Sequence, residues 1–250
     1  MNMVGRSLKI IVGVGGLVIA TVAASAALAQ QPAAPQTMEV VLVHVKPGQE
    51  QAYQDWLKNT VNPVRIKGGV KDRQAWSTSL GPGGEFYFVS PITGLSSYDT
   101  PPSNQAEAAA VFEKLRSMVS DARTYLITAR PELSVEPKPG YQAKVAVLST
   151  HSVSPGRVEA YMTNQKARNA VIAKTNAKGV LVSQSGLGGD PNEFNVLVMF
   201  DSFADLGNFS AEFAKASTAA KLPPEAAGIV GRTNRRVLRY RPDLSIVPAP

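Results

Sequence analysis

Few side chains in this 250-residue chain could act on another molecule. It has two histidines, His44 and His151, and no cysteine, which excludes thiolate chemistry and cysteine-based metal sites. The histidines are expected on equivalent strands but one position out of register, so they would point to opposite faces. They have no third ligand at a suitable spacing. We therefore predict no metal site, and favour structural or rim positions for both.

Aromatic, amide and guanidinium side chains could instead form a pocket for a small aromatic molecule. Tyrosine occurs at the same place in two similar segments, and the first segment alone adds tryptophan, asparagine and arginine. The alternative for the tyrosines is core packing with the hydroxyl at the edge. Trp56 stands at helical spacing from Tyr53, which is also typical of a core. The candidate pocket residues are Tyr53, Trp56, Asn62, Arg65, Trp76 and Tyr161.

Other catalytic patterns are missing from the sequence. No Ser-His-Asp order stands out, and the carboxylates are sparse and unpaired. Glycine-rich stretches at 81–84 and 186–189 have neither a following helix nor a P-loop lysine. The sequence thus indicates neither hydrolysis nor nucleotide binding. It assigns no catalytic residue and predicts no cofactor.

The candidate residues belong to a unit that occurs twice. Val45-Lys46-Pro47-Gly48 recurs as Val153-Ser154-Pro155-Gly156, and Gly69-Val70 as Gly179-Val180. Each copy closes on one phrase, Arg130-Pro131-Glu132-Leu133-Ser134 and then Arg241-Pro242-Asp243-Leu244-Ser245. The order of the shared pieces is preserved, which predicts a tandem duplication of a unit of about 105 residues. We interpret the closing phrase as a structural latch.

The hydrophobic pattern predicts the order β-α-β-β-α-β in each copy. In the first copy, strands are expected at 37–45, 70–80, 85–89 and 122–128, and helices at 49–61 and 105–119. Pro63 would end or kink the first helix. In the second copy, strands are expected at 145–153, 180–185, 195–200 and 236–240, with helices at 157–174, 204–216 and 225–230.

This element order is the ferredoxin-like arrangement, an antiparallel sheet with both helices on one face. The bare face needs a cover, and two units can cover each other. On its Pro-Gly turns leading into a helix with Tyr53 or Tyr161, and its aromatic strand Phe86-Tyr87-Phe88, the chain resembles the dimeric α/β-barrel superfamily, in particular its NIPSNAP-like and antibiotic-biosynthesis-monooxygenase-like branches. The resemblance covers residues 37–250. It implies an α+β fold of two ferredoxin-like units packed sheet to sheet as a pseudo-dimeric α/β barrel, either monomeric or a homodimer.

The resemblance also bears on activity. Relatives that bind haem are expected to carry an axial histidine on a helix, and neither His44 nor His151 is expected on one, so the sequence does not favour haem. Some members oxidise polyphenols without a cofactor, using tryptophan, tyrosine, asparagine and arginine between sheet and helices. This implies a single pocket in the first copy.

The first 29 residues have the pattern of a secretory signal peptide. Arg6 and Lys9 precede an apolar run, and Ala27-Leu28-Ala29 is typical of a cleavage site. The alternative is an uncleaved membrane anchor. We expect a disordered spacer at 30–36, the first repeat at 37–135, a linker at 136–140 and the second repeat at 141–250. The mature protein would be periplasmic or extracellular, without stable membrane insertion.

The charge and composition leave three functions open. Cleavage would remove two of the cations behind the net charge of +7, and the remaining basic residues are too scattered to indicate nucleic-acid binding. We favour an exported, non-catalytic small-molecule-binding or accessory protein. The alternatives are a cofactor-independent oxygenase- or isomerase-like enzyme and a structural interaction module.

Overall fold

A computed structural model describes residues 36–99, 104–222 and 228–247. The first copy contains β1 (Thr37–Val45), α1 (Glu50–Trp56), a π-helical turn (Leu57–Val61), α2 (Asn62–Lys67), β2 (Gln74–Leu80), β3 (Glu85–Pro91), a 3-10 turn (Leu95–Tyr98), α3 (Gln105–Met118), β4 (Val119–Ala129) and a second 3-10 turn (Pro131–Leu133). The second copy contains β5 (Val145–Val153), α4 (Val158–Ile172), β6 (Gly179–Ser185), β7 (Glu193–Phe200), α5 (Phe203–Ala219) and β8 (Val230–Tyr240). Both copies thus have the predicted order of elements.

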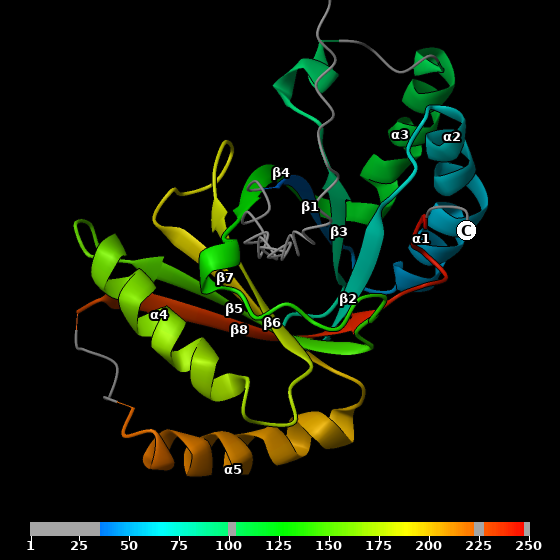
Figure 1. Ribbon diagram of the computed structural model, residues 1–250. Helices are drawn as coiled ribbons and strands as arrows, with labels where there is room; N and C mark the ends of the chain where they lie inside the picture. The colour runs from blue at the N-terminus through cyan, green and yellow to red at the C-terminus, as the bar shows by residue number, and fades with distance from the viewer. Residues whose placement is uncertain (1–35, 100–103, 223–227, 248–250) are drawn as a thin grey trace, which may run out of the picture. The chain divides into compact units, whose positions relative to one another are not determined.

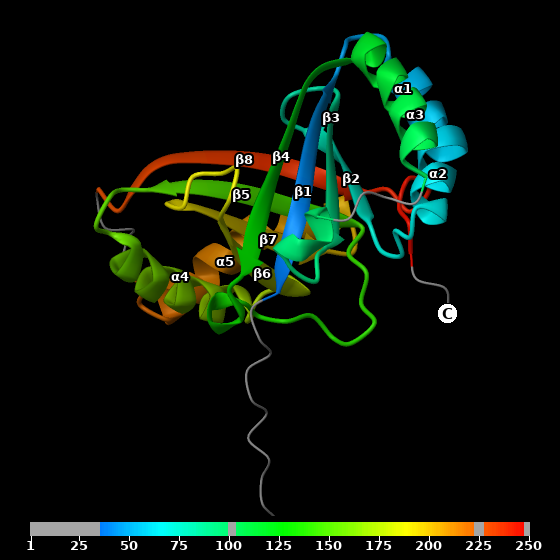
Figure 2. The same cartoon turned by 90° about the horizontal axis from the view of Figure 1, so that it is seen from above.

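The eight strands form one closed barrel in the order β1-β3-β2-β8-β5-β7-β6-β4. Every neighbouring pair is antiparallel, and the copies join where β2 pairs with β8 and β4 with β6. The helices lie outside the barrel, with α1 to α3 over the first copy's strands and α4 and α5 over the second's (Figure 1; Figure 2). Closure leaves no sheet edge unpaired. The predicted pseudo-dimeric α/β barrel is confirmed.

Strand alternation divides the buried side chains into three cores. Val43 and Phe86 face the helices of the first copy, and Phe194 and Phe200 face those of the second. The intervening strand positions, such as Trp76, point into the barrel and form the third core. Two side chains that are adjacent in sequence on a strand therefore lie in different cores, one inside the barrel and one under the helices.

The closing phrase of each copy is bound to the other copy. Leu133, which follows the first copy, packs in the second copy's core, and Leu244 packs in the first copy's core. Asn169 donates a hydrogen bond to the Leu133 carbonyl at 2.7 Å, and Asn62 donates to the Leu244 carbonyl at 2.9 Å. The phrase therefore ties the two copies together twice, as a latch.

Two local predictions need correction. Pro63 does not end the first helix. A π-helical turn leads directly into α2, and the proline lies in the first turn of α2. There the missing N–H removes no hydrogen bond that the helix needs. Strand β2 begins at Gln74, after Gly69 and Val70. In the first copy, Arg73 just before β2 occupies the position equivalent to Val180. Val180 forms an isolated bridge with Val135, and Arg73 forms the corresponding bridge with Ile246.

The expected signal peptide and almost all of the spacer, at residues 1–35, lie outside the described residues. Half of the short helix expected at 225–230, residues 225–227, also lies outside them. The other half is not helical, because Gly228 and Ile229 form a turn and a bend and Val230 begins β8. Among the helices that the structure describes, none has the length and apolar character needed to cross a membrane.

Candidate ligand-binding cavity

A cavity of about 350 Å³ occupies the barrel interior. Its wall is mainly apolar and aromatic and is supplied by strands of both copies. The lining residues include Met38, Val40, Trp76, Tyr87, Val89, Tyr125, Ile127, Leu148, Leu181, Ser183, Asn195, Leu197 and Leu238. This volume falls in the usual range for small-molecule sites, about 300–1,000 Å³.

The cavity exists because the two copies place side chains of unequal size at equivalent positions. In the first, Trp76 pairs across the ladder with Tyr87 and Tyr240. At the equivalent place in the second, Ser183 pairs with Asn195 and Ala129. Three large rings in the first copy thus correspond to three small side chains in the second. A symmetric barrel with rings on both sides would have little room left.

Polar groups on the small side of the cavity could orient a ligand. The Ser183 hydroxyl forms no hydrogen bond within the described ranges. The Asn195 side chain accepts a hydrogen bond from Thr150 at 3.0 Å and donates a long one to Ser185 at 3.4 Å. Asp72 and Glu136 also line the cavity, whereas none of the described lysines or arginines does. The site therefore suits a neutral molecule with a hydroxyl or carbonyl better than an anion.

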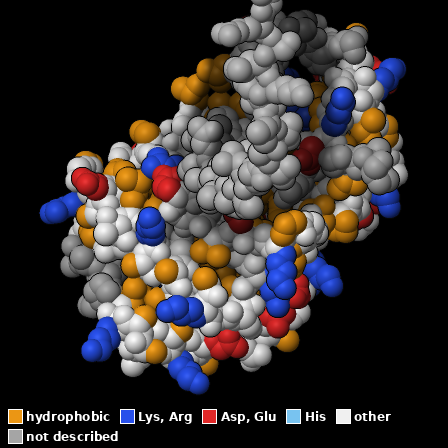
Figure 3. Space-filling model, in the orientation of Figure 1, with side chains coloured by type: hydrophobic (Ala, Val, Ile, Leu, Met, Phe, Trp, Pro, Cys, Tyr) orange, Lys and Arg blue, Asp and Glu red, His pale blue; other side chains and the backbone are white. Residues whose placement is uncertain are grey.

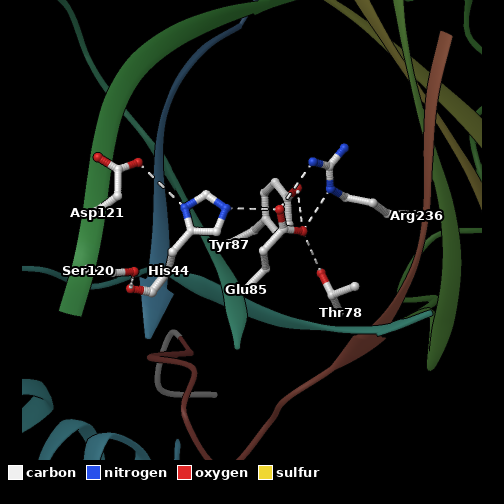
Figure 4. A network of polar contacts seen from close by, with 7 residues as sticks. All are labelled: His44, Thr78, Glu85, Tyr87, Ser120, Asp121 and Arg236. Carbon is white, nitrogen blue, oxygen red and sulfur yellow. Dashed lines mark hydrogen bonds and ion pairs between the residues drawn. The ribbon is translucent and has the colours of Figure 1, made fainter. Parts of the chain in front are cut away.

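Next to this cavity, a charged network surrounds the Glu85 carboxylate, whose side chain has no exposed surface (Figure 4). Arg236 of β8 donates to both of its oxygens, at 2.7 and 3.1 Å. His44 Nε2 lies 3.0 Å from one oxygen, and the Thr78 hydroxyl donates to the other at 3.0 Å. On its far side, His44 Nδ1 lies 3.5 Å from the exposed carboxylate of Asp121. The network thus runs from the barrel surface to a fully buried charge.

Tyr87 connects this network to the cavity. Its ring lines the cavity wall, and its hydroxyl donates a weak hydrogen bond of 3.3 Å to Glu85. Burial alone would raise the pKa of Glu85, but the hydrogen bonds from Arg236, His44 and Thr78 outweigh burial and lower it. Burial and the Glu85 charge raise the pKa of Tyr87 well above its usual value. The carboxyl is therefore ionised at neutral pH, and Tyr87 stays a protonated donor.

The six candidate pocket residues do not share one cavity. Trp76 lines the barrel interior, whereas Tyr53 and Trp56 pack between sheet and helices. Asn62 binds the Leu244 carbonyl, and Arg65 borders a separate cavity of about 120 Å³. Tyr161 packs in the second copy's outer core and contacts His151 Nδ1 at 2.9 Å. The separation follows from strand alternation, because Trp76 points inward and the helix residues lie on the other face.

The two histidines do point to opposite faces, as predicted. His44 binds Glu85 inside the barrel, and His151 lies against Tyr161 under the helices. Neither is on a helix, so the residues present do not match the axial histidine expected for haem. Within the described ranges, no group of three histidine, aspartate or glutamate side chains could hold a metal ion.

The Glu85 network could not be predicted from the sequence, because Glu85 and its strongest partner, Arg236, are 151 residues apart and belong to different copies. The repeat carried one usable signal. Glu85 has a counterpart in Glu193, but His44 corresponds to Ser152 and Tyr87 to Asn195, so only the first copy surrounds its glutamate with histidine and tyrosine. The residues that differ between the copies therefore mark the site.

Comparison with solved structures places this geometry in a known fold. A candidate monooxygenase from Lactobacillus acidophilus is 10% identical, with 86% of this chain and 97% of that one covered and a TM-score of 0.56. A second candidate monooxygenase, from Fusobacterium nucleatum, is 14% identical over 83% and 93%, with a TM-score of 0.58. A mutant chlorite dismutase from Candidatus Nitrospira defluvii is 10% identical over 82% and 92%, with a TM-score of 0.54. No protein-family model matches the chain, and no curated protein matches it by sequence.

This chain has the dimeric α/β-barrel fold. Identities of this size carry the fold and not the activity. The NIPSNAP-like resemblance stays a prediction.

Proposed function

We propose that this protein is an exported, non-catalytic binding protein that takes a small neutral aromatic molecule into its barrel. The observation that carries the proposal is the unequal layer in which Trp76 and Tyr87 face Ser183 and Asn195 across a cavity of about 350 Å³. A flat ring can stack against the large aromatic side chains. Its hydroxyl or carbonyl could hydrogen-bond to Ser183 or Asn195, which are among the lining residues. A ligand would thus gain both apolar burial and an orienting hydrogen bond.

The electrostatics support binding more than catalysis. Among the described cavity side chains, Tyr87 hydrogen-bonds to the Glu85 carboxylate, and burial together with the Glu85 charge raises the pKa of Tyr87 and keeps it protonated. A general base should instead have a pKa near the working pH. The arrangement supports a hydrogen-bond donor in a fixed place. Glu85 and Arg236 then act as a rigid support behind the cavity wall.

A second candidate is a cofactor-independent oxygenase- or isomerase-like enzyme. The solved structures with similar folds include candidate monooxygenases and an anthrone oxidase-like protein. The Asp121–His44–Glu85–Tyr87 contacts could carry a proton between the surface and the cavity. Oxygen uptake with a panel of phenols separates the candidates. Turnover by the wild type that is lost in Glu85→Gln would favour the enzyme.

Export and oligomeric state belong to the same proposal. The charged start and Ala27-Leu28-Ala29 support cleavage before Gln30, which the mass of the protein from the host's envelope would test. We expect a monomer, because the second copy takes the place that a partner subunit has in a two-chain barrel. On the face in Figure 3, basic side chains lie among apolar and acidic ones.

The chain's two tryptophans allow a direct test of the binding site. Both are buried, but only Trp76 lines the cavity. 4-Bromophenol quenches indole fluorescence on contact, through the heavy bromine atom. We expect saturable quenching of the indole fluorescence in Trp56→Phe, where Trp76 is the only tryptophan, and none in Trp76→Phe, where Trp56 remains. Phenol at the same concentrations is the control for non-specific effects. Equal or unsaturable quenching in both variants would contradict the proposal.

A further inference from the structure

Two arginines, the buried Arg73 and the partly buried Arg65, lie in the helix-covered layer of the first copy, on the opposite side of the sheet from the barrel cavity. The Arg73 guanidinium lies 3.9 Å from the centre of the Phe88 ring, and that of Arg65 lies 5.2 Å from the Phe112 ring. Arg73 is only 3% exposed. Buried arginines are rare unless they are paired. A reason is therefore needed for two of them in one core.

Neither guanidinium has a carboxylate partner among the described residues. In the part of the chain that the structure describes, no side-chain nitrogen of Arg65 or Arg73 forms a hydrogen bond or an ion pair, and Arg73 Nη1 and Arg65 Nε are buried without any partner. Glu39 is the nearby acid that acts on both charges, but its carboxylate accepts a hydrogen bond from Tyr98 at 2.6 Å. Outside the described ranges the sequence holds one acidic side chain, Glu225 of the second copy.

The second copy shows that the fold does not need these charges. Arg73 corresponds to Val180, which forms the equivalent bridge. Arg65 follows Asn62 by three residues, as Ile172 follows Asn169, and the two asparagines make equivalent hydrogen bonds. Valine and isoleucine thus fill the same two places in an apolar core. Arginine at these two positions is found in the first copy alone, at a cost in desolvation, although the second copy has Arg168 at another position, 5.4 Å from the centre of the Phe213 ring.

The cost appears in the protonation equilibria. Burial, with the neighbouring Arg65 charge, lowers the pKa of Arg73 to about 9, and burial also lowers that of Arg65. The Tyr53 hydroxyl is close enough to interact with both charges. An anion close to these guanidinium groups would relieve the unfavourable burial; Arg65 borders a cavity that could admit one, and Arg73 is not among the residues that line it. Beside Arg65 there is room for an apolar body, in the cavity of about 120 Å³ lined by Val61, Val64, Val111 and Phe112.

We propose that Arg65 and Arg73 form an anion site in this layer, and that the ligand is the carboxylate of a small apolar acid. The guanidinium groups bind the carboxylate, and the valine and phenylalanine side chains bury the rest of the molecule. The site is independent of the barrel cavity, which lies across the sheet and has acidic residues at its wall. Inorganic phosphate shares the charge but lacks the apolar body, so it should bind more weakly.

The test measures the thermal unfolding midpoint and the affinity of the full chain with isobutyrate or benzoate at constant ionic strength. Neutral isobutyramide and benzamide, and inorganic phosphate, are the comparisons. We expect the carboxylates to raise the midpoint by a saturable amount, the amides to have no effect and phosphate to act only at higher concentration. Equal effects of phosphate and the carboxylates would overturn the choice of ligand. No effect of any anion would overturn the site.

Arg73→Met removes the charge and keeps a side chain that can pack on Phe88. Without ligand it should unfold at the wild-type temperature or above, because an unpaired buried charge is gone. Its affinity for isobutyrate should fall by about 10- to 100-fold, as for a lost charged hydrogen bond. Arg116→Met, at an exposed site in the same copy, is the matched control and should bind normally. Arg65→Met is the second variant if Arg73→Met folds poorly. Unchanged affinity in the Arg73 and Arg65 variants would overturn the proposal.

Discussion

At the scale of single residues, Glu85 has the most demanding environment in the described structure. Its carboxylate is fully buried and receives hydrogen bonds from Arg236 and Thr78, with His44 at 3.0 Å. A buried charge is tolerated when it is paired and its remaining lone pairs are satisfied. The network therefore holds a carboxylate ionised behind the Tyr87 wall of the cavity. Removing that charge should affect the whole barrel.

Glu85→Gln should lower the free energy of unfolding at neutral pH by about 3 kcal/mol, the lower end of the range for breaking a buried pair. The pKa of Glu85 in the folded protein lies below its ordinary 4.5. Its stabilisation is therefore present above that value and is lost as the pH falls through the folded pKa. Urea unfolding at pH 6, 5, 4 and 3 should show the difference between wild type and variant shrinking as the pH falls.

Glu132→Gln is the control for this experiment. Glu132 also pairs with an arginine, Arg130, but half of its side chain is exposed, and such surface pairs contribute about 0–1 kcal/mol. It should show a small loss at neutral pH. A Glu85→Gln effect that is equally small, or that stays constant down to pH 3, would contradict the role given to the network.

Residue-level prediction from the sequence succeeded where a local rule applied. Register alone placed His44 and His151 on opposite faces, and the structure confirms it. The prediction failed for Arg73. The Gly-Val dipeptide found in both copies aligned Val180 with Val70, whereas the true counterpart of Val180 is Arg73, a residue too different to be recognised by sequence identity. The prediction also missed Glu85, since no local pattern connects Glu85 with Arg236 on the far copy. A charged residue that occurs in one copy only cannot be recognised from the sequence repeat until the structure shows which positions correspond.

At the scale of elements, the asparagine latch explains why the closing phrase is repeated. Asn62 and Asn169 each bind a leucine carbonyl on the segment that arrives from the other copy. The leucine itself is buried, at 1% exposed for Leu244 and 3% for Leu133. A carbonyl buried in this way needs a donor, and the asparagine supplies it. The latch should therefore be energetically significant at both ends.

Asn62→Ala and Asn169→Ala should each lower the free energy of unfolding by about 1–3 kcal/mol, the cost of an unsatisfied buried carbonyl. Chemical denaturation of the two variants measures the change. The loss should be larger for Asn169→Ala, because Asn169 also accepts a buried hydrogen bond from Gln165 at 2.7 Å, whereas Asn62 Oδ1 has no partner among the described residues. Asn59→Ala, an exposed site on the π-helical turn, should have little effect. Losses no larger than that of Asn59→Ala would show that the leucines alone hold the phrase.

Element prediction was most accurate where the hydrophobic pattern was continuous. The strands at 37–45 and 145–153 coincide with β1 and β5. Less regular segments shifted, as β2 starts four residues later than expected and β8 six residues earlier. Continuation of the first helix past Pro63 could not be foreseen, because a π-helical turn leaves no pattern in the residues around it. Tertiary contacts with Leu244 hold that region in place.

At the scale of the whole molecule, the duplication allows the sheet to close into a barrel, and the sequence differences between the two copies create the candidate sites. The two copies complete one barrel, so their sheet faces cover each other and a stable scaffold results. Side chains then differ between equivalent positions: Trp76 against Ser183 in the barrel, and Arg73 against Val180 under the helices. The first difference opens a cavity, and the second places a cation in a core. The fold was predictable from the repeat. The sites were not, because they lie at equivalent positions where the two copies have different residues.

The central claim is that the missing bulk at Ser183 creates a ligand site, and its most direct test is to restore that bulk. Ser183→Trp would place a second indole opposite Trp76 and fill much of the cavity. Calorimetric titration with 4-bromophenol should show affinity reduced about tenfold or more, while Ser183→Ala, which keeps the space, should bind nearly as wild type. The unfolding midpoint of each variant checks that the barrel is intact. Undiminished binding by a folded Ser183→Trp protein would contradict the account.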